Sequence, residues 1–140
     1  MDLLNEVFQA YQYTIYSMGA VAGLMIIQII VIDITGILTR HIPGSSIEVD
    51  HNNFLFRATR SLGNTNESIA VFIMLALFCI LSMASPSITA VCAWSYFFAR
   101  LGHTLFYYAK IGFARSICFG LVLFSLVAML LTGVFGFHGA

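Results

Sequence analysis

Apolar residues fill four long stretches of the chain, and polar residues are largely confined to the short segments between them. The stretches span residues 10–38, 58–84, 87–109 and 115–137. An α-helix needs about 20 mostly apolar residues to cross a bilayer, and each stretch is long enough. Their apolar positions run continuously and do not alternate, which argues against a membrane β-barrel. The pattern therefore predicts four transmembrane helices.

The connections between these stretches are short. The segment "RHIPGSSIEVDHNN" (40–53) is the one substantial loop, whereas "ASPS" (84–87) and "KIGFA" (110–114) read as tight turns. Short connections place consecutive helices antiparallel to one another. We therefore expect an all-α integral membrane protein, with residues 1–140 forming a single four-helix bundle domain.

Composition supports a membrane location. The chain of 140 residues is 60% hydrophobic and only 9% charged, whereas a soluble domain has about 25% charged residues. Because basic residues favour cytosolic loops, both termini are predicted to point away from the cytosol. The six basic residues lie in or near the first and third connections: Arg40, Arg57, Arg60, Arg100, Lys110 and Arg115.

Polar residues enter the second stretch as a stripe. Within "RATRSLGNTNES" (57–68), Arg60, Asn64 and Glu67 fall within roughly 60° of one another at about 100° per residue. Arg57 lies one turn earlier, on nearly the same face. A charge at membrane depth costs about 2.5–3.5 kcal/mol and is a functional candidate by default.

Two later stretches carry polar residues to the same surface. Arg100, His103 and Tyr107 share one face of the third stretch, and Arg115 and Ser116 open the fourth. We expect the three stripes to line one polar pocket. Two structural alternatives remain: the outermost cations anchor the helices by reaching toward lipid head groups, or Glu67 forms an ion pair with Arg60 or Arg100.

The residues of this pocket indicate the kind of ligand. Several arginines and a single carboxylate suit a small zwitterion with more than one carboxylate and one ammonium group, because arginine binds carboxylates with two parallel hydrogen bonds. A metal or haem site is not expected. The histidines (His41, His51, His103, His138) are dispersed, and the cysteines (Cys79, Cys92, Cys118) lack ligand spacing.

The two helical motifs resemble those of a known family. "Arg60-x-x-x-Asn64-x-x-Glu67" and "Arg100-x-x-His103-x-x-x-Tyr107", the latter followed by "Arg115-Ser116", are similar to the signature of the MAPEG superfamily. These are the membrane-associated proteins of eicosanoid and glutathione metabolism. The likeness is greatest to the branch of microsomal and bacterial glutathione transferases and prostaglandin E synthases.

The resemblance implies a homotrimer that binds glutathione between neighbouring subunits near the cytosolic face. It implies that Arg115, with Ser116, faces the sulfur and is catalytic. Arg40 resembles a further glutathione-contacting arginine, and Arg57 is a candidate because it precedes Arg60 by one turn. The residues expected to hold the tripeptide are Arg60, Asn64, Glu67, Arg100, His103 and Tyr107.

The implied chemistry is activation of the glutathione thiol. A free thiol has a pKa near 8.5, and its thiolate is the nucleophile. Lowering that pKa by about two takes roughly 2.7 kcal/mol, which a nearby arginine can supply. The thiolate would attack a lipophilic electrophile from the bilayer or act on a peroxide. Phe119 stands where prostaglandin synthase relatives carry a tyrosine, so no hydroxyl can donate there.

Two other functions stay open. A non-catalytic scaffold of the same fold would bind lipid or glutathione without thiolate chemistry. A small proton-coupled exporter would place its glutamate in the first helix, where this chain has only Gln28 and Asp33. The expected location is a bacterial inner membrane or the endoplasmic reticulum, with the bilayer and a lipophilic substrate as partners and no nucleic acid.

Overall fold

The protein is a bundle of long helices with one short helix at its N-terminal end. The computed structural model describes residues 2–138 and consists of helices joined by turns and one loop. The helices are α1 (Asp2–Ala10), α2 (Gln12–Leu38), α3 (Phe54–Leu81), α4 (Pro86–Tyr108) and α5 (Gly112–His138).

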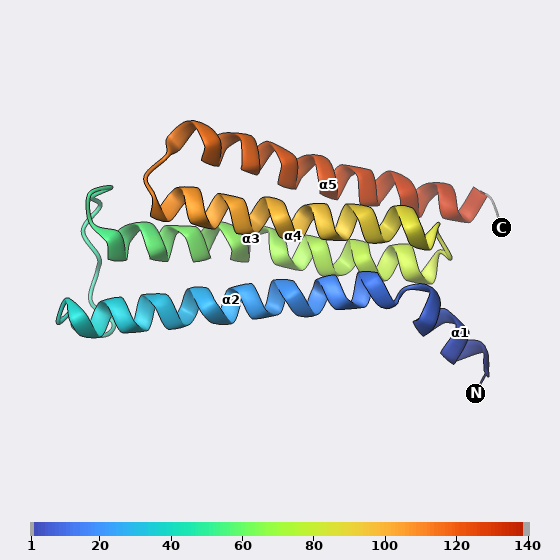
Figure 1. Cartoon of the computed structure of the whole chain (residues 1–140), viewed down its shortest axis with the longest axis horizontal. Helices are drawn as coiled ribbons and strands as arrows, with labels where there is room; N and C mark the ends of the chain where they lie inside the picture. The colour runs from blue at the N-terminus through green and yellow to red at the C-terminus, as the bar shows by residue number, and fades with distance from the viewer. Residues whose placement is uncertain (1, 139–140) are drawn as a thin grey trace.

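The four long helices alternate in direction, as Figure 1 shows. The loop between α2 and α3 and the connection between α4 and α5 lie at one end of the bundle, which we call the loop end. The helix α1, the turn between α3 and α4, and the last turn of α5 lie at the other end, which we call the terminal end. The alternation predicted from the apolar stretches therefore matches the arrangement of the chain.

The predicted helix bounds need correction at both ends of the bundle. The N-terminal residues form a separate helix, α1, which was not predicted, and α2 begins at Gln12 and not at residue 10. The two helices meet at the buried Tyr11, whose hydroxyl donates a hydrogen bond to the carbonyl oxygen of Ala84. This contact ties the break between the helices to the turn between α3 and α4.

The second long helix, α3, begins at Phe54, four residues before the predicted residue 58, and ends at Leu81. The helix begins early because Asn53 caps it: the side-chain oxygen of Asn53 accepts a hydrogen bond of 2.9 Å from the backbone N–H of Leu55. An asparagine in this position satisfies an otherwise unpaired amide of the first turn. Arg57 therefore lies within the first turn of the helix and not before it.

The last two helices also begin before their predicted residues. Pro86 is the first residue of α4, a position where its missing N–H costs nothing. Helix α5 begins at Gly112, three residues before the predicted residue 115. These two helix starts move by one and three residues, which is at most about one turn. The polar residues predicted to lie in the two helices therefore remain in them.

Three helices are long and apolar enough to cross a membrane among residues 2–138. They are α2, α3 and α5. Helix α4 does not meet this criterion, and it directs several polar side chains, including Arg100 and His103, into the bundle. Three helices therefore have the length and composition of membrane-spanning helices. That α4 forms a fourth span stays a prediction, supported by its length and its antiparallel packing in the bundle.

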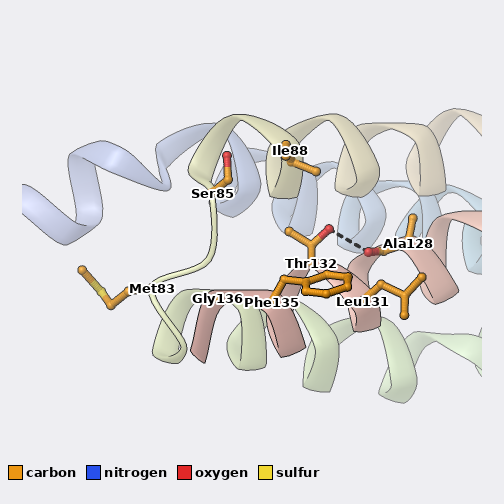
Figure 2. Close-up of a pocket in the computed structure, with 8 residues that line it drawn as sticks. All are labelled: Met83, Ser85, Ile88, Ala128, Leu131, Thr132, Phe135 and Gly136. Atoms are coloured by element: carbon orange, nitrogen blue, oxygen red, sulfur yellow. Dashed lines mark hydrogen bonds between the residues drawn. The ribbon is translucent and has the colours of Figure 1, made fainter. Parts of the chain in front are cut away.

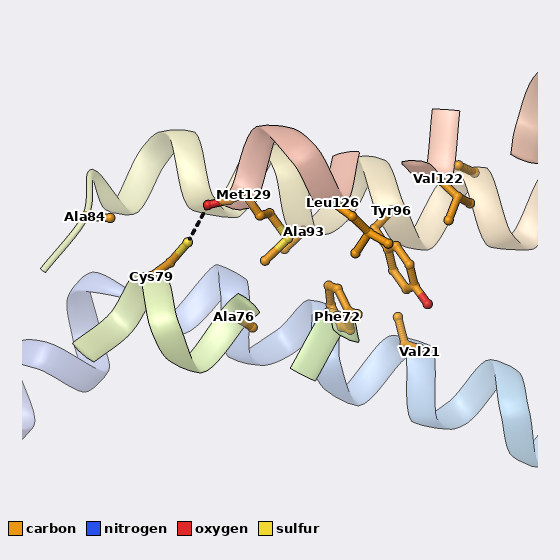
Figure 3. Packing of buried hydrophobic residues seen from close by; sticks show 11 residues of the cluster. Val21, Phe72, Ala76, Cys79, Ala84, Ala93, Tyr96, Val122, Leu126 and Met129 are labelled. Carbon is orange, nitrogen blue, oxygen red and sulfur yellow. Dashed lines mark hydrogen bonds between the residues drawn. The ribbon is translucent and has the colours of Figure 1, made fainter. Parts of the chain in front are cut away.

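The hydrophobic core joins α2, α3, α4 and α5 through small and aromatic side chains. Phe72 of α3 stacks on Tyr96 of α4 with ring centroids 4.2 Å apart and planes within 5°, as Figure 3 shows. Small residues such as Ala76 and Ala93 are fully buried. They let the helix backbones approach closely, which is how helices associate within lipid.

Polar side chains are also buried in the bundle, while many large apolar side chains face outward. The amide nitrogen of Gln28 donates to the hydroxyl of Thr104 at 2.8 Å and lies 3.3 Å from those of Ser61 and Thr65. These bonds connect α2, α3 and α4. An apolar exterior with a hydrogen-bonded polar interior is the arrangement that a lipid solvent favours.

Candidate functional site

A polar cavity of about 310 Å³ opens at the loop end of the bundle, between α3, α4 and α5. This volume lies at the lower limit of typical ligand pockets, which measure about 300–1,000 Å³. Six of the ten predicted site residues line it, and Phe119 completes the lining. The six are Arg60, Asn64, His103, Tyr107, Arg115 and Ser116.

The guanidinium of Arg115 is held against an aromatic ring. Its Cζ lies 4.5 Å from the centre of the Tyr107 ring, an arrangement in which the cation is attracted to the π face. Ser116 follows directly, and its hydroxyl donates to the carbonyl oxygen of Gly112 at 3.1 Å. The sulfur-facing pair implied by the family resemblance therefore lies on the first turns of α5, at the wall of the cavity.

The short connection between α4 and α5 brings these two residues together. Lys110 adopts a left-handed backbone conformation with φ 64°. The amides of Lys110 and Ile111 bond back to the carbonyl oxygens of Tyr107 and Phe106 at 3.2 and 2.9 Å. This is the pairing of a Schellman motif, which ends a helix and reverses the chain. Helix α5 therefore starts beside the last turn of α4.

His103 of α4 lies at the bottom of the cavity, close to Tyr107 of the same helix and Phe119 of α5. It is 3% exposed, and its ring centroid lies 5.7 Å from that of Tyr107 and 6.4 Å from that of Phe119. Its Nδ1 is buried without a hydrogen-bond partner among the described residues. A buried polar atom without a partner is costly, so this nitrogen is a ready contact for a polar ligand in the cavity.

Arg100 does not line this cavity, although it was expected to share one polar pocket with His103 and Tyr107; its contact with a ligand stays a prediction. It is 1% exposed and lies deeper in the bundle, where its Nη2 donates to the hydroxyl of Ser68 at 2.6 Å. That hydroxyl also lies 2.7 Å from the phenol oxygen of Tyr96. The Nε and Nη1 of Arg100 have no partner among the described residues.

Glu67 is also outside the cavity, on the exposed surface of α3. It lines a separate, mainly apolar groove of about 380 Å³ between α3 and α5. Among residues 2–138 it forms no ion pair with Arg60 or Arg100, so the structural ion pair considered from the sequence is not formed within one chain. Glu67 follows Asn64 by three residues, about 4.5 Å along the helix.

Neither of the other two candidate arginines lines the cavity. Arg57 binds the loop: its Nη1 donates to the carbonyl oxygens of His51 and Asn52 at 2.7 and 3.0 Å, and its Nε to that of Tyr108 at 3.3 Å. Arg40 lies beyond the end of α2 with φ 54° and is exposed. A role for either in binding the ligand stays a prediction.

A second, basic cavity of about 250 Å³ adjoins the first and shares Tyr107 and Arg115 with it. His51, Arg57, Lys110 and Gly112 complete its lining. His51 was not predicted to contribute. It lies 64 residues before Arg115 in the sequence, and no local pattern in the loop indicated that it would meet the start of α5.

A larger cleft lies at the terminal end, far from these residues. It measures about 680 Å³, and mainly apolar side chains from α4, α5 and the turn before α4 line it. Figure 2 shows Leu131, Phe135 and Thr132 along α5, with the Thr132 hydroxyl donating to the carbonyl oxygen of Ala128 at 2.7 Å. It holds no charged side chain, so the polar chemistry belongs to the loop end.

Comparison with known proteins decides the family. The model of the MAPEG family matches residues 14–135, which covers every candidate residue and all of the four long helices except the first two residues of α2 and the last three of α5. The chain belongs to the MAPEG family. No curated protein matches the chain in sequence.

Membership in MAPEG and three membrane-capable helices make this chain an integral membrane protein. The family comprises membrane proteins of glutathione and eicosanoid metabolism, among them glutathione transferases and related enzymes, and its members commonly use glutathione. The cavity at the loop end, which residues of both helical motifs line, is the candidate functional site of this MAPEG protein.

Proposed function

We propose that this MAPEG protein is a membrane-bound glutathione transferase. The observation that supports this proposal is the cavity in which the guanidinium of Arg115, stacked on Tyr107, lies beside Ser116, Arg60 and Asn64. Residues from the two family motifs and from the Arg115-Ser116 pair thus meet in one place.

The lining of the cavity fits glutathione, a tripeptide with two carboxylates, one ammonium group and one thiol. Arg60 supplies a guanidinium for a carboxylate. Asn64 can donate and accept hydrogen bonds, and the unpaired Nδ1 of His103 lacks the partner that a bound polar group would provide. Glu67 lies outside this cavity, one turn farther along the exposed face of α3, and its carboxylate is proposed to hold the ammonium group at the boundary with a neighbouring copy of the chain.

The chemistry proposed for the chain rests on Arg115. When bound, glutathione supplies a thiol that reacts as a thiolate. The positive charge of Arg115 favours the charged form of a sulfur placed beside it. The hydroxyl of Ser116, which now donates to a backbone carbonyl, can turn to donate a hydrogen bond to the same sulfur. Tyr107 holds the guanidinium in place from below.

The second reactant is proposed to be a lipophilic electrophile that arrives through the bilayer. The apolar groove that begins at Glu67 runs between α3 and α5 and is lined by leucine and valine side chains. We also propose four membrane spans, with α4 as the third, and a homotrimeric assembly. The orientation with the loop end in the cytosol stays a prediction from the distribution of basic residues.

The role of Arg115 is tested by replacing it with leucine in the purified, detergent-solubilised protein. We expect glutathione binding measured by calorimetry to be largely retained. The thiolate absorbance of bound glutathione and the conjugation of a chlorodinitrobenzene substrate should fall by about tenfold or more, because a thiol pKa that returns toward 8.5 leaves a few per cent thiolate at neutral pH.

Arg115→Lys is the matched variant. It keeps the charge but loses the planar group that stacks on Tyr107, so we expect intermediate thiolate absorbance. Unchanged conjugation in Arg115→Leu would refute the proposed role of this residue. Glutathione binding without thiolate absorbance in the unmodified protein would instead indicate the non-catalytic scaffold.

A further inference from the structure

The basic cavity beside the first cavity is positively charged, and no acidic side chain among its described lining residues neutralises this charge. Arg57, Lys110, Arg115 and His51 line it, and none of the described residues lining it is acidic. These side chains come from the loop before α3, the first turn of α3, the end of α4 and the start of α5. Three permanent cations around a cavity of about 250 Å³ create a positive potential that attracts anions.

The contacts of these cations leave their charge uncompensated. Arg57 donates to three backbone carbonyl oxygens. The ammonium group of Lys110 donates to the side-chain oxygen of Asn52, and Arg115 stacks on a neutral phenol ring. The nearest acid along the loop, Asp50, accepts a hydrogen bond from the backbone N–H of Asn52 at 2.8 Å. Neutral acceptors therefore orient the cations without neutralising them.

The position of the cavity indicates where its anion comes from. It lies at the level where α4 ends and α3 and α5 begin, which is the level of lipid head groups for helices that span a bilayer. The apolar side chains that flank Gly112 are exposed: Phe113 is 81% and Ile111 47% exposed. An amphiphile can place an anionic group among the cations and its hydrocarbon against these side chains.

We infer that this cavity binds the phosphate group of an anionic phospholipid. Basic pockets between membrane helices are known sites for such head groups, and each Lys or Arg near the surface contributes about 1 kcal/mol to the attraction. The inference goes beyond the proposed function, because Arg57, Lys110 and His51 do not line the first cavity, whereas Tyr107 and Arg115 line both.

The test measures thermal unfolding of the full chain in a neutral detergent, without glutathione, during titration with short-chain phosphatidylglycerol. A ligand that binds only the folded protein raises the unfolding temperature with concentration. We expect this rise with phosphatidylglycerol and not with phosphatidylcholine. Lys110→Gln should shift the titration midpoint to about fivefold higher lipid concentration, the loss expected for one surface cation, and Arg57→Gln should do the same.

Arg40→Gln is the matched control, because Arg40 is a cation at the same end of the bundle that does not line the cavity. It should leave the midpoint unchanged. Inorganic phosphate and glycerol phosphate, tested at the same concentrations, should not stabilise the protein. The proposal is overturned if both lipids act equally, if Arg40→Gln acts as Lys110→Gln does, or if free phosphate acts as well as the lipid, which would mean a site for soluble anions.

Discussion

Arg100 shows how far a single residue can differ from what its position on a helix predicts. It shares a face of α4 with His103, yet His103 lines the cavity while Arg100 points to Ser68 in α3. A helical wheel gives the direction of a side chain around its own helix, but not the depth or identity of the neighbouring helix. The sequence indicated Arg100 as a candidate residue, but not that it would lie outside the cavity within one chain; its contact with a ligand stays a prediction.

The bond between Ser68 and Arg100 should matter for stability. We expect Ser68→Ala to lower the free energy of unfolding by about 1–3 kcal/mol, because it removes the only protein acceptor recorded for a buried guanidinium among the described residues. The measurement is denaturant unfolding in detergent micelles. Ser95→Ala, on the exposed face of α4, the helix that carries Arg100, should change stability by less than about 0.5 kcal/mol. Equal effects of the two would contradict this.

At the scale of elements, the turn between α3 and α4 packs closely against both α5 and the break between α1 and α2. The Tyr11 hydroxyl bonds to Ala84 within it, and Gly136 of α5 packs directly on it. A Cβ atom at Gly136 would lie 2.8 Å from the carbonyl oxygen of Ser82 and 2.9 Å from the Cα of Ala84. Both are backbone atoms, which cannot move aside cheaply.

We therefore expect Gly136→Ala to destabilise the protein by about 1–3 kcal/mol, the usual cost of overpacking. The same measurement on Gly120→Ala provides the comparison within α5, since a Cβ there meets nothing within 4 Å. Alanine is the better helix former by about 0.8–1.0 kcal/mol, so Gly120→Ala should be neutral or stabilising. Destabilisation of the same size in both variants would exclude the packing explanation.

The helices themselves were largely predictable from the sequence, because long apolar runs can satisfy their backbone groups in lipid only as helices. Their ends were less predictable. Three helices, α2, α3 and α4, are followed by a residue with left-handed backbone conformation that is not glycine: Arg40, Met83 and Lys110. The usual glycine signal for a helix end is absent at these positions, and the capping side chain of Asn53 lies at the end of the segment 40–53, which the sequence predicts as a loop.

The meeting of most candidate residues was predictable from the sequence, but the full geometry of the site was not. Four residues of the two motifs and the Arg115-Ser116 pair line one cavity because the antiparallel helices bring their starts and ends to the same surface. The other four candidates lie outside it, since side-chain contacts with the loop and with neighbouring helices depend on three-dimensional packing: Arg40, Arg57, Glu67 and Arg100. The contribution of His51 likewise follows from how the loop folds over α3.

At the scale of the whole molecule, the exposed polar surface of α3 implies a partner. Glu67 is exposed and lies 13 residues after Phe54, about 20 Å into the helix. An uncovered charge at such depth in lipid would cost about 2.5–3.5 kcal/mol. Pairing with a cation of a second copy of the chain would offset this cost, and a closed ring of three copies agrees with the proposed assembly.

Chemical cross-linking in native membranes should therefore give species up to three chains and no larger. The measurement is denaturing electrophoresis after cross-linking, with a sample that was denatured before cross-linking as the control. A pattern that ends at a single chain or at two chains would contradict the trimer. Glu67→Gln, which removes the charge but keeps the shape, should leave the pattern intact.

The separation of the two ends of the bundle has a practical consequence. Helix α1 and the end of α5 both lie at the terminal end, while both polar cavities lie at the loop end. A tether attached to either chain terminus would immobilise every molecule on a sensor surface with its cavities facing the solution. Binding of glutathione and of lipid could then be followed on the same oriented layer without a tag beside either cavity.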